Sequence, residues 1–368
     1  MSQPADETDE SPPAPSRFRS FLHRHRRAGW IALAVVLALL LVVGGYAWRL
    51  NSHLSDIDRF STSTIKNRPA KAPTKALNIL LLGSDKGQPV AGAEHTTLAE
   101  DAVADSWPVG KYRSDTLMVV HISADREHVQ VVSIPRDSFV MIRDSAGTDQ
   151  HREKINAAFS DWGPNGAIAT VEALTGLRLD HVAIIDWAGF RDLSTAVGGV
   201  PVTVPEEVYD SKQKKLWKAG DYLLKGEEAL QYVRMRYGLT RSDFDRIARQ
   251  QNFLRSLMRE ILASGSLTKP LEFDRMLGAL TENLTIDEAW TNGDLRSLAL
   301  GLRGISEGDV DFLTMPIGQE RTDPTYGAVL EVDTAKAKEL FTALRQDRMS
   351  RYLKKYPDDV LAEDDQIS

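Results

Sequence analysis

The chain has 368 residues, 42% of them hydrophobic and 26% charged, which is typical of a folded globular protein. A net charge of −7 argues against a nucleic-acid partner, because proteins that bind nucleic acids usually carry an excess of basic residues. The absence of cysteine excludes disulfide bonds and thiolate metal sites.

An uncharged run from Ala28 to Trp48 predicts a transmembrane helix, because about 31 Å of helix is enough to cross a hydrocarbon core of about 30 Å. Five arginines precede the run and only Arg49 follows closely. The positive-inside rule then predicts a cytoplasmic N-terminus and an exported remainder. A cleaved signal peptide is the alternative, but its apolar region usually spans only about 7–15 residues. We therefore expect a single-pass type II protein of the cell membrane.

The composition around this run predicts five regions. Residues 1–27 form a cytoplasmic tail, 28–48 the transmembrane helix and 49–76 a polar stalk that contains two prolines. An extracytoplasmic catalytic domain is expected over residues 77–350, followed by a disordered C-terminal tail over residues 351–368.

The predicted domain begins with a strand over Leu77–Leu82. Residues 86–110 lose periodicity and predict a loop insertion. The β-branched runs Thr116–Ile122 and Val129–Ile134 predict neighbouring strands joined by a polar turn.

Helical and strand patterns alternate through the rest of the chain. The predicted elements are a helix from Lys154 to Gly176, a strand His181–Asp186, a helix Phe190–Ala196, a strand Val200–Val204, a helix Glu227–Arg236, a long helix from Asp243, a strand Val310–Met315 and a helix Thr334–Arg345. This alternation predicts an α/β fold with a central mixed sheet flanked by helices.

Arginines cluster around the predicted start of the long helix: Arg234, Arg236, Arg241, Arg246 and Arg249. A guanidinium presents a planar fork of donors that matches phosphate oxygens, and a helix start adds free N–H groups. Arg246, Arg249 and Gln250 are spaced to share one helix face. Spacing alone leaves a solvated charged face, paired with neighbouring aspartates, equally open.

Arg136 follows the predicted strand Val129–Ile134 and a rigid proline, which favours a position in a cleft at the edge of a sheet. A salt bridge at the strand end is the alternative. Asp85 and Asp115 each lie at the edge of an apolar strand. Two carboxylates together with substrate phosphates are a usual way to hold Mg²⁺, although each aspartate alone is typical of a turn or cap.

Other common active-site motifs are absent from the sequence. The histidines have no HExxH spacing, and no Walker A motif or Gly-x-Ser-x-Gly elbow occurs. Zinc proteases, P-loop NTPases and serine hydrolases are therefore poorly supported.

Seven stretches together resemble the LytR-CpsA-Psr family of bacterial envelope proteins, over roughly residues 77–263. They are Asn78–Asp85 (NILLLGSD), Tyr112–Met118 (YRSDTLM), Val132–Asp137 (VSIPRD), Lys154–Ala158 (KINAA), Gly198–Val202 (GGVPV), Tyr232–Arg236 (YVRMR) and Ser242–Gln251 (SDFDRIARQQ). The resemblance implies a phosphotransferase that moves a glycopolymer phosphate from a polyprenyl-pyrophosphate carrier to peptidoglycan.

The resemblance also implies site residues. The residues that it implies to bind pyrophosphate are Arg113, Arg136, Lys154, Arg234, Arg236, Arg246 and Gln250. The residues that it implies to act directly in catalysis are Arg136, Arg236 and Arg246. Asp137 and Asp243 are the candidates to accept the proton of the attacking hydroxyl. Mg²⁺ (or Mn²⁺) binding falls on Asp85 and Asp115. The expected partners are the lipid-linked glycan, peptidoglycan and the membrane.

Two alternative functions remain open at this point. A pyrophosphatase acting on the same lipids would need the same residues, with water as acceptor. A non-catalytic scaffold for polyprenyl lipids would gain nothing from carboxylates near its phosphate.

Two departures from the family pattern also matter: the 86–110 insertion separates the proposed metal ligands, and Asp245 stands where a glycine is frequent.

Overall fold

The computed structural model describes residues 41, 44–86, 98–104, 107–235, 237–239, 243–263, 269–362 and 367. The chain divides into two units, Met1–Ser52 and His53–Ser368. In the first unit the described residues are helical. Among the described residues, no helix combines the length and the apolar composition needed to cross a bilayer. Most of the predicted transmembrane segment 28–48 lies outside the described residues, so that segment stays a prediction.

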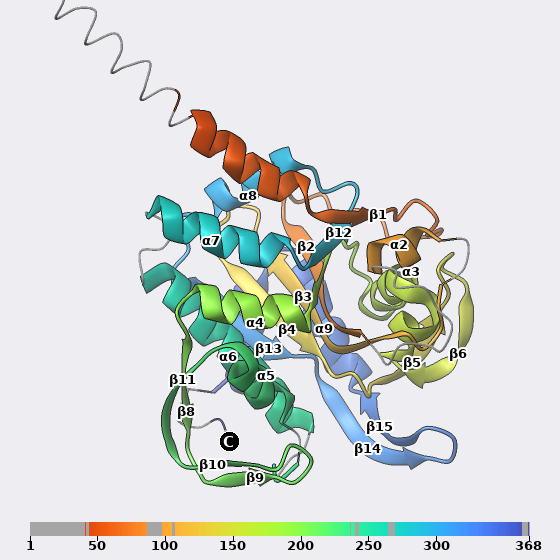
Figure 1. The fold of residues 1–368 in the computed structure, drawn as a ribbon. Helices are drawn as coiled ribbons and strands as arrows, with labels where there is room; N and C mark the ends of the chain where they lie inside the picture. Colours follow the sequence, from red (N-terminus) through yellow and green to blue (C-terminus); the bar gives the residue numbers. More distant parts are fainter. Residues whose placement is uncertain are drawn as a thin grey trace, which may run out of the picture. The chain divides into compact units, whose positions relative to one another are not determined.

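A seven-stranded mixed sheet is the centre of the second unit (Figure 1). Its strands, in order across the sheet, are β1 (Asp58–Phe60), β12 (Leu284–Asp287), β7 (His181–Asp186), β2 (Leu77–Lys86), β3 (Tyr112–Ile122), β4 (Val129–Ile134) and β13 (Val310–Thr314). The pairs β1–β12, β7–β2 and β4–β13 are parallel, and the others are antiparallel.

Two-stranded ribbons and helices surround this sheet. The ribbons pair β5 (Phe139–Arg143) with β6 (Asp149–Lys154), β8 (Val200–Val204) with β11 (Gly220–Leu224), β9 (Val208–Asp210) with β10 (Lys215–Trp217), and β14 (Ile317–Asp323) with β15 (Gly327–Val332). The α-helices are α2 (Leu98–Val103), α3 (Ala157–Thr175), α4 (Trp187–Ala196), α5 (Gly226–Arg234), α6 (Asp243–Ala263), α7 (Pro270–Thr281), α8 (Asn292–Gly301), α9 (Thr334–Arg345) and α10 (Met349–Lys355), with single 3-10 turns at Glu307–Asp309 and Pro357–Asp359. The predicted α/β fold with a mixed, helix-flanked sheet is confirmed.

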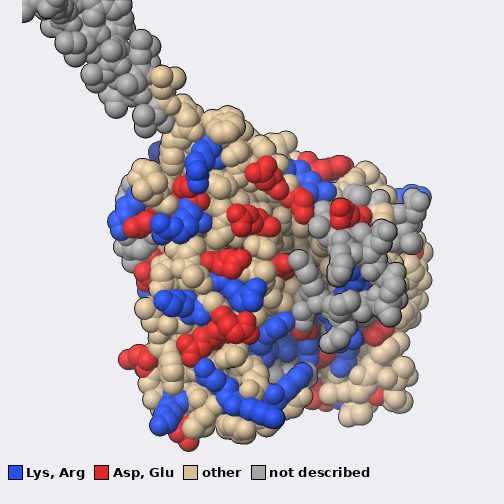
Figure 2. Space-filling model, viewed as in Figure 1, with Lys and Arg blue, Asp and Glu red and all other residues tan. Residues whose placement is uncertain are grey.

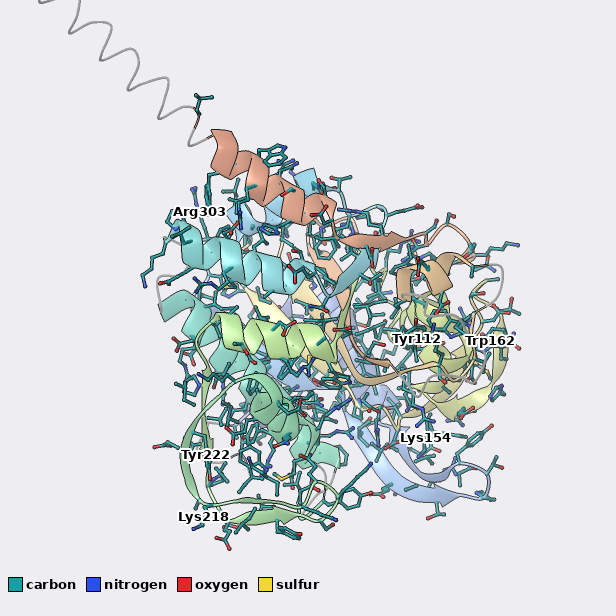
Figure 3. All side chains as sticks on the ribbon, in the orientation of Figure 1. Tyr112, Lys154, Trp162, Lys218, Tyr222 and Arg303 are labelled. Atoms are coloured by element: carbon teal, nitrogen blue, oxygen red, sulfur yellow. The ribbon has the colours of Figure 1, made fainter. Side chains whose placement is uncertain are left out.

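Alternate residues of the central strands pack on opposite faces of the sheet. In β3, Leu117 and Val119 join a cluster with α3 and α9, whereas Met118 joins a cluster with α8 on the other face. A third cluster is formed by α4, α5, α6 and α7 with the β8–β11 ribbon around the buried Trp217 and Phe253. Side chains fill the spaces between these layers (Figure 3).

Much of the segment predicted as a stalk is part of the folded unit. Strand β1 pairs with β12, and Phe60 is 1% exposed. Farther along, the Arg68 guanidinium lies 2.7 Å from the Glu172 carboxylate of α3. The prediction was wrong for residues 58–76, because their few apolar side chains are too widely spaced to give a strand or helix pattern and are buried only by contacts with distant segments.

The C-terminal boundary also differs from the prediction. Helix α10 continues to Lys355, its Tyr352 is buried, and Leu361 donates a backbone hydrogen bond of 2.8 Å to Phe312 of β13. Residues 351–362 are therefore ordered structure rather than a disordered tail. The predicted 86–110 loop contains the helix α2. Trp107, which follows α2 within the same segment, packs against Tyr112 (labelled in Figure 3) and Phe159 of α3.

The strand directions bring distant motifs to one edge of the sheet. Strands β2, β4 and β13 run in one direction and β3 runs in the opposite direction. The carboxyl ends of β2, β4 and β13 therefore meet the beginning of β3. A β-bulge between Gly83 and Ser84 on β2 leaves Asp115 of β3 as the extra residue, and bulges of this kind re-aim a side chain beside active sites.

Candidate functional site

A cavity of about 500 Å³ lies at this edge of the sheet, and we call it the arginine cavity. Its lining residues are Asp115, Arg136, Asp210, Lys212, Gln213, Glu227, Leu230, Gln231, Arg234, Tyr237 and Arg246. Figure 2 shows basic side chains gathered in the same part of the molecule, where Figure 1 places α5 and β9. Three arginines from separate segments thus face one space, as the motifs predicted.

Arg136 and Asp115 form an ion pair within the lining of the cavity. The Arg136 Nη1 lies 2.5 Å from the Asp115 Oδ1, and the arginine side chain is 13% exposed. Burial opposes the charged carboxylate, but Arg136, with Arg246 and Arg234 nearby, holds the pKa of Asp115 below its ordinary value. Asp115 is therefore ionised at every physiological pH and can balance the guanidinium charges until an anion enters.

Arg246 and Arg234 supply the other two guanidinium groups. Arg246 lies in the first turn of α6 and is 5% exposed, so its charge is held in a site with little water. Arg234 ends α5, and its guanidinium carbon lies 4.5 Å from the ring centre of Trp187. Stacking on an indole orients a guanidinium while leaving its edge donors available to a ligand. The arrangement is suited to a group with several phosphate oxygens.

Arg249 does not share the position of Arg246, although the helical spacing placed both on one face. It is 2% exposed, lies 5.2 Å from the ring centre of Tyr232, and its Nη1 contacts the sulfur of Met235 at 3.4 Å. Burial lowers the pKa of its guanidinium. Its contacts fix the end of α5 and the residue that follows it.

Gln250, predicted to contact pyrophosphate, joins three elements of the cavity. Its Oε1 accepts a hydrogen bond of 3.2 Å from the Thr116 hydroxyl of β3, and its Nε2 donates one of 3.3 Å to the Val233 carbonyl of α5. Thr116 and Val233 directly neighbour Asp115 and Arg234 in the chain. The geometry therefore indicates a positioning role for this amide.

Asp137 and Lys154 lie next to Arg136 but are not among the lining residues of the cavity. The Asp137 carboxylate accepts from Lys154 Nζ at 3.0 Å and lies 3.6 Å from Arg136 Nε. Lys154 ends β6 and does not begin a helix as predicted, because α3 starts only at Ala157. The pair thus contacts the guanidinium group of Arg136 at the margin of the cavity lining.

The remaining predicted residues differ in how far the structure describes them. Arg113 is exposed on β3 and is not among the lining residues either. Arg236 lies outside the described residues, as do the side chains of Asp85 and Asp243. Asp85 pairs through its backbone with Arg113, two residues from Asp115, so the 86–110 insertion does not separate the two strands.

The donors at this edge fit a magnesium ion only in part. Among the described residues, no group of three or more histidine, aspartate or glutamate side chains could hold a metal. Mg²⁺, however, often takes only one or two carboxylates from the protein and completes its shell with water and substrate phosphates. Among the described residues, Asp115 of β3 offers a carboxylate at this edge, beside Arg136.

The sequence did not indicate the part of the cavity that comes from the β9–β10 ribbon and from the α5 residues before Arg234. Asp210 is buried, and its Oδ1 accepts from the backbone N–H groups of Lys212 and Gln213 at 2.9 Å each. This Asx-type turn directs the tip of the ribbon toward the arginines. A turn could be expected from Asp210-Ser-Lys, but no local pattern shows that the turn reaches α5.

A model of the LytR_cpsA_psr family matches residues 49–346. The chain is 34% identical over 313 residues to the probable cell wall biosynthesis protein LcpB of Corynebacterium glutamicum, a match that covers 85% of this chain and 69% of that protein. It is 30% identical over 356 residues to the cell wall biosynthesis protein LcpA of the same species, covering 89% and 68%.

A third relative has a solved structure. The polyisoprenyl-teichoic acid–peptidoglycan teichoic acid transferase TagV of Bacillus subtilis is 30% identical over 275 residues, covering 72% of this chain and 64% of that protein. The crystal structure of B. subtilis TagV superposes with a TM-score of 0.59 at 26% identity, covering 75% of this chain and 98% of the solved one. The chain spans about two thirds of the length of these relatives.

Proposed function

The chain belongs to the LytR_cpsA_psr family, as its motifs predicted, and we propose that it transfers a glycopolymer phosphate from a polyprenyl-pyrophosphate carrier to peptidoglycan. The observation that carries this proposal is the arginine cavity, where Arg136, Arg234 and Arg246 surround one space. Relatives named for cell wall biosynthesis and for teichoic acid transfer to peptidoglycan support the same reaction class.

The proposed reaction is one phosphoryl transfer. A hydroxyl oxygen of a muramic acid attacks the phosphorus on the glycan side of the pyrophosphate and forms a new P–O bond. The bond from that phosphorus to the bridging oxygen breaks, and polyprenyl phosphate leaves with the bond's electron pair. The hydroxyl proton passes to a carboxylate at the site, for which Asp137 and Asp243 are the candidates.

The arginines supply most of what this transfer needs from a protein. Phosphoryl transfer depends on positioning and charge stabilisation more than on covalent chemistry. Arg136 and Arg246 are largely buried, so their charges are weakly screened and require little reorganisation as negative charge develops. Arg234 and Lys212 at the more exposed side would hold the outer phosphate and the first sugar.

We further propose that Asp85 and Asp115 hold Mg²⁺ (or Mn²⁺) together with the substrate phosphates. The bound ion would neutralise charge on the pyrophosphate. The ionised state of Asp115 supports this role, because a carboxylate with a lowered pKa does not need to lose a proton to bind a cation.

The membrane anchor and the extracytoplasmic position remain part of the proposal. They rest on the run Ala28–Trp48 and its flanking arginines. A carrier with a polyprenyl chain keeps its tail in a bilayer, so an anchored enzyme meets its substrate at a raised effective concentration. The proposed regions are a cytoplasmic tail at 1–27 and a transmembrane helix at 28–48, followed by the exported catalytic unit.

The test measures transfer of a radiolabelled lipid-linked glycan to peptidoglycan oligomers by Arg136→Ala and Arg246→Ala proteins. Each loss should slow transfer about 30- to 1,000-fold, the range for removing one donor that stabilises transition-state charge. Glu127→Gln, in the turn at the opposite edge of the sheet, serves as the control and should retain the wild-type rate. Wild-type rates in both arginine variants would contradict the proposal.

The same assay separates transfer from hydrolysis and tests the metal. Free phosphorylated glycan as the main product would identify a pyrophosphatase, and a wild-type protein that binds the lipid-linked donor but forms neither product would identify a scaffold. Chelation of divalent cations should lower the wild-type rate at least tenfold and added Mg²⁺ should restore it, whereas Asp115→Asn should respond weakly to both. A wild-type rate that is insensitive to chelation would remove the metal from the proposal.

A further inference from the structure

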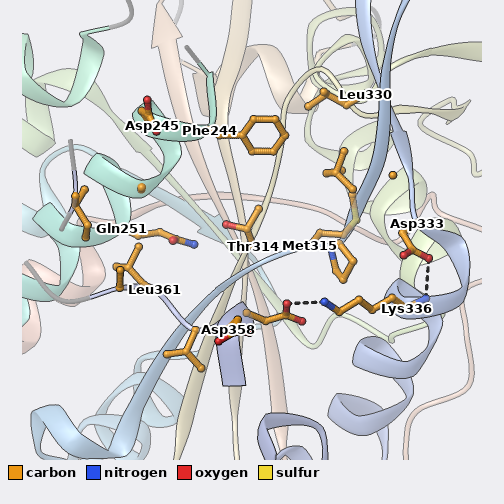
Figure 4. A pocket seen from close by; sticks show the side chains of 18 of the residues that line it. Phe244, Asp245, Gln251, Thr314, Met315, Leu330, Asp333, Lys336, Asp358 and Leu361 are labelled. Atoms are coloured by element: carbon orange, nitrogen blue, oxygen red, sulfur yellow. Dashed lines mark hydrogen bonds and ion pairs between the residues drawn. The ribbon is translucent and has the colours of Figure 1, made fainter. Parts of the chain in front are cut away.

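A second cavity, of about 530 Å³, lies at the same edge of the sheet as the arginine cavity (Figure 4). Phe244 and Asp245 of α6 lie on one side of it, and Asp333 and Lys336 at the beginning of α9 lie on the opposite side. The end of β13 forms part of its wall. We call it the carboxylate cavity.

The two cavities share structural walls. Asp245 lines the carboxylate cavity and the next residue, Arg246, lines the arginine cavity, so the first turn of α6 stands between them. Leu330 lines the carboxylate cavity, and its N–H donates a hydrogen bond of 2.9 Å to the backbone carbonyl of Asp137, which follows Arg136. A molecule held in the carboxylate cavity would therefore lie beside the residues proposed to bind the pyrophosphate.

The charges of the two cavities are opposite in character. The described acidic residues that line the carboxylate cavity are Asp245, Glu320, Asp333, Asp358 and Asp359, and Lys336 is the one base among the described lining residues. Lys336 Nζ already pairs with Asp359 at 2.6 Å. Such a lining repels pyrophosphate and an anionic polymer, so it disfavours the donor.

The same lining suits an uncharged glycan. Carboxylate oxygens are strong acceptors for sugar hydroxyls and for the N–H groups of acetamido substituents. Phe244 and Ile317, both partly exposed, offer apolar surface to the C–H face of a sugar ring. The volume lies within the roughly 300–1,000 Å³ typical of small-ligand sites.

The chemistry of the reaction requires a separate place for the acceptor. In-line displacement brings the attacking oxygen to the side of the phosphorus opposite the leaving group. We propose that the carboxylate cavity is the acceptor subsite, which binds an amino-sugar strand whose lactyl carboxyl groups are amide-linked and therefore uncharged, and presents its hydroxyl to the phosphorus held by the arginines. This inference rests on the proposed function and names the residues that recognise its second substrate.

The test uses the full chain with the double substitution Glu320→Gln and Asp358→Asn. Both side chains are exposed at the cavity, so their loss should not impair folding, and the replacements keep their shapes. With saturating lipid-linked donor, the KM for peptidoglycan oligosaccharide should rise about tenfold, as expected when a hydrogen bond to a charged group is weakened. The donor KM should stay unchanged. Glu127→Gln is the matched control, with both constants unchanged.

A binding measurement separates this inference from the proposed function. Calorimetric titration with a peptidoglycan tetrasaccharide whose lactyl carboxyl groups are capped as amides should show binding to the wild type and about tenfold weaker binding to the double variant, whether or not transfer is observed. A short-chain prenyl pyrophosphate should bind both proteins equally. Equal oligosaccharide affinity and equal acceptor KM in the two proteins would overturn the acceptor subsite, while leaving the arginine-dependent transfer untouched.

Discussion

At the residue scale, identical side chains in one motif have different environments. Arg246 lines the arginine cavity, whereas Arg249, three residues later, is buried against Tyr232 and Met235. Helical spacing alone placed both on one face. The difference arises because the end of α5 covers the second arginine, and packing of this kind is not encoded within α6.

Gln250 provides a prediction at this scale. Gln250→Met keeps the side-chain volume but removes the hydrogen bonds to Thr116 and Val233. We expect kcat for transfer to fall about tenfold with little change in the donor KM, because the arginines and Asp115 stay present but lose their relative alignment. The measurement is steady-state transfer kinetics alongside thermal unfolding.

The control for this prediction is Gln130→Met. Gln130 of β4 donates a buried hydrogen bond of 3.0 Å to Asp311 of β13, near the other end of the two strands. It should lose about 1 kcal/mol of stability, as Gln250→Met should, but keep its kcat. Equal kcat in the two variants would show that Gln250 has only a structural role.

At the element scale, the segment before β2 is joined to the rest of the unit by charge as well as by strand pairing. Arg68 makes hydrogen bonds to both carboxylate oxygens of Glu172, whose side chain is 2% exposed, and to the carbonyl of Leu179. The Glu172 carboxylate also accepts from the N–H of Leu179. The segment before β2 is therefore held against α3 by these hydrogen bonds.

Arg68→Ala should lower the free energy of unfolding by about 3–5 kcal/mol, because Glu172 would be left as a buried charge without its guanidinium. Lys269→Ala is the control: its ion pair with Glu272 is exposed at both side chains, 56% and 42%, and should contribute less than about 1 kcal/mol. Chemical denaturation measures both. Similar losses in the two variants would contradict the structural role of residues 58–76.

At the scale of the whole chain, catalysis and encounter with the substrate depend on different parts of the sequence. The arginine cavity lies entirely within the unit His53–Ser368, whereas the proposed anchor lies within Met1–Ser52. The chemistry should therefore survive removal of the anchor, while the rate on a membrane-held substrate should not.

A chain that lacks residues 1–50 should transfer glycan from a soluble short-chain donor at the rate of the full chain. On donor embedded in vesicles it should be at least tenfold slower, because the anchor raises the local concentration of enzyme and lipid. Transfer assays with both donors and both proteins measure this. Equal rates on vesicle-bound donor would remove the encounter role from the anchor.

The fold class, the family and the arginine motifs could be read from the sequence alone. Short apolar and β-branched runs predicted β2, β3, β4 and β7, because buried strands carry their signal locally. Arg136, Arg234 and Arg246 were named without any coordinate, because they stand in motifs that resemble those of the family.

Only the tertiary structure decided which of these residues meet and which lie elsewhere. The strand directions brought Asp115 beside Arg136, and the β9–β10 ribbon added Asp210 and Lys212 from a region without a motif. Residues 58–76 and 351–362 were missed because their order comes from pairing with β12, α3 and β13, which are distant in sequence. The physical reason is the same in each case: a local pattern records what one segment can bury, but contacts between distant segments decide where that surface is placed.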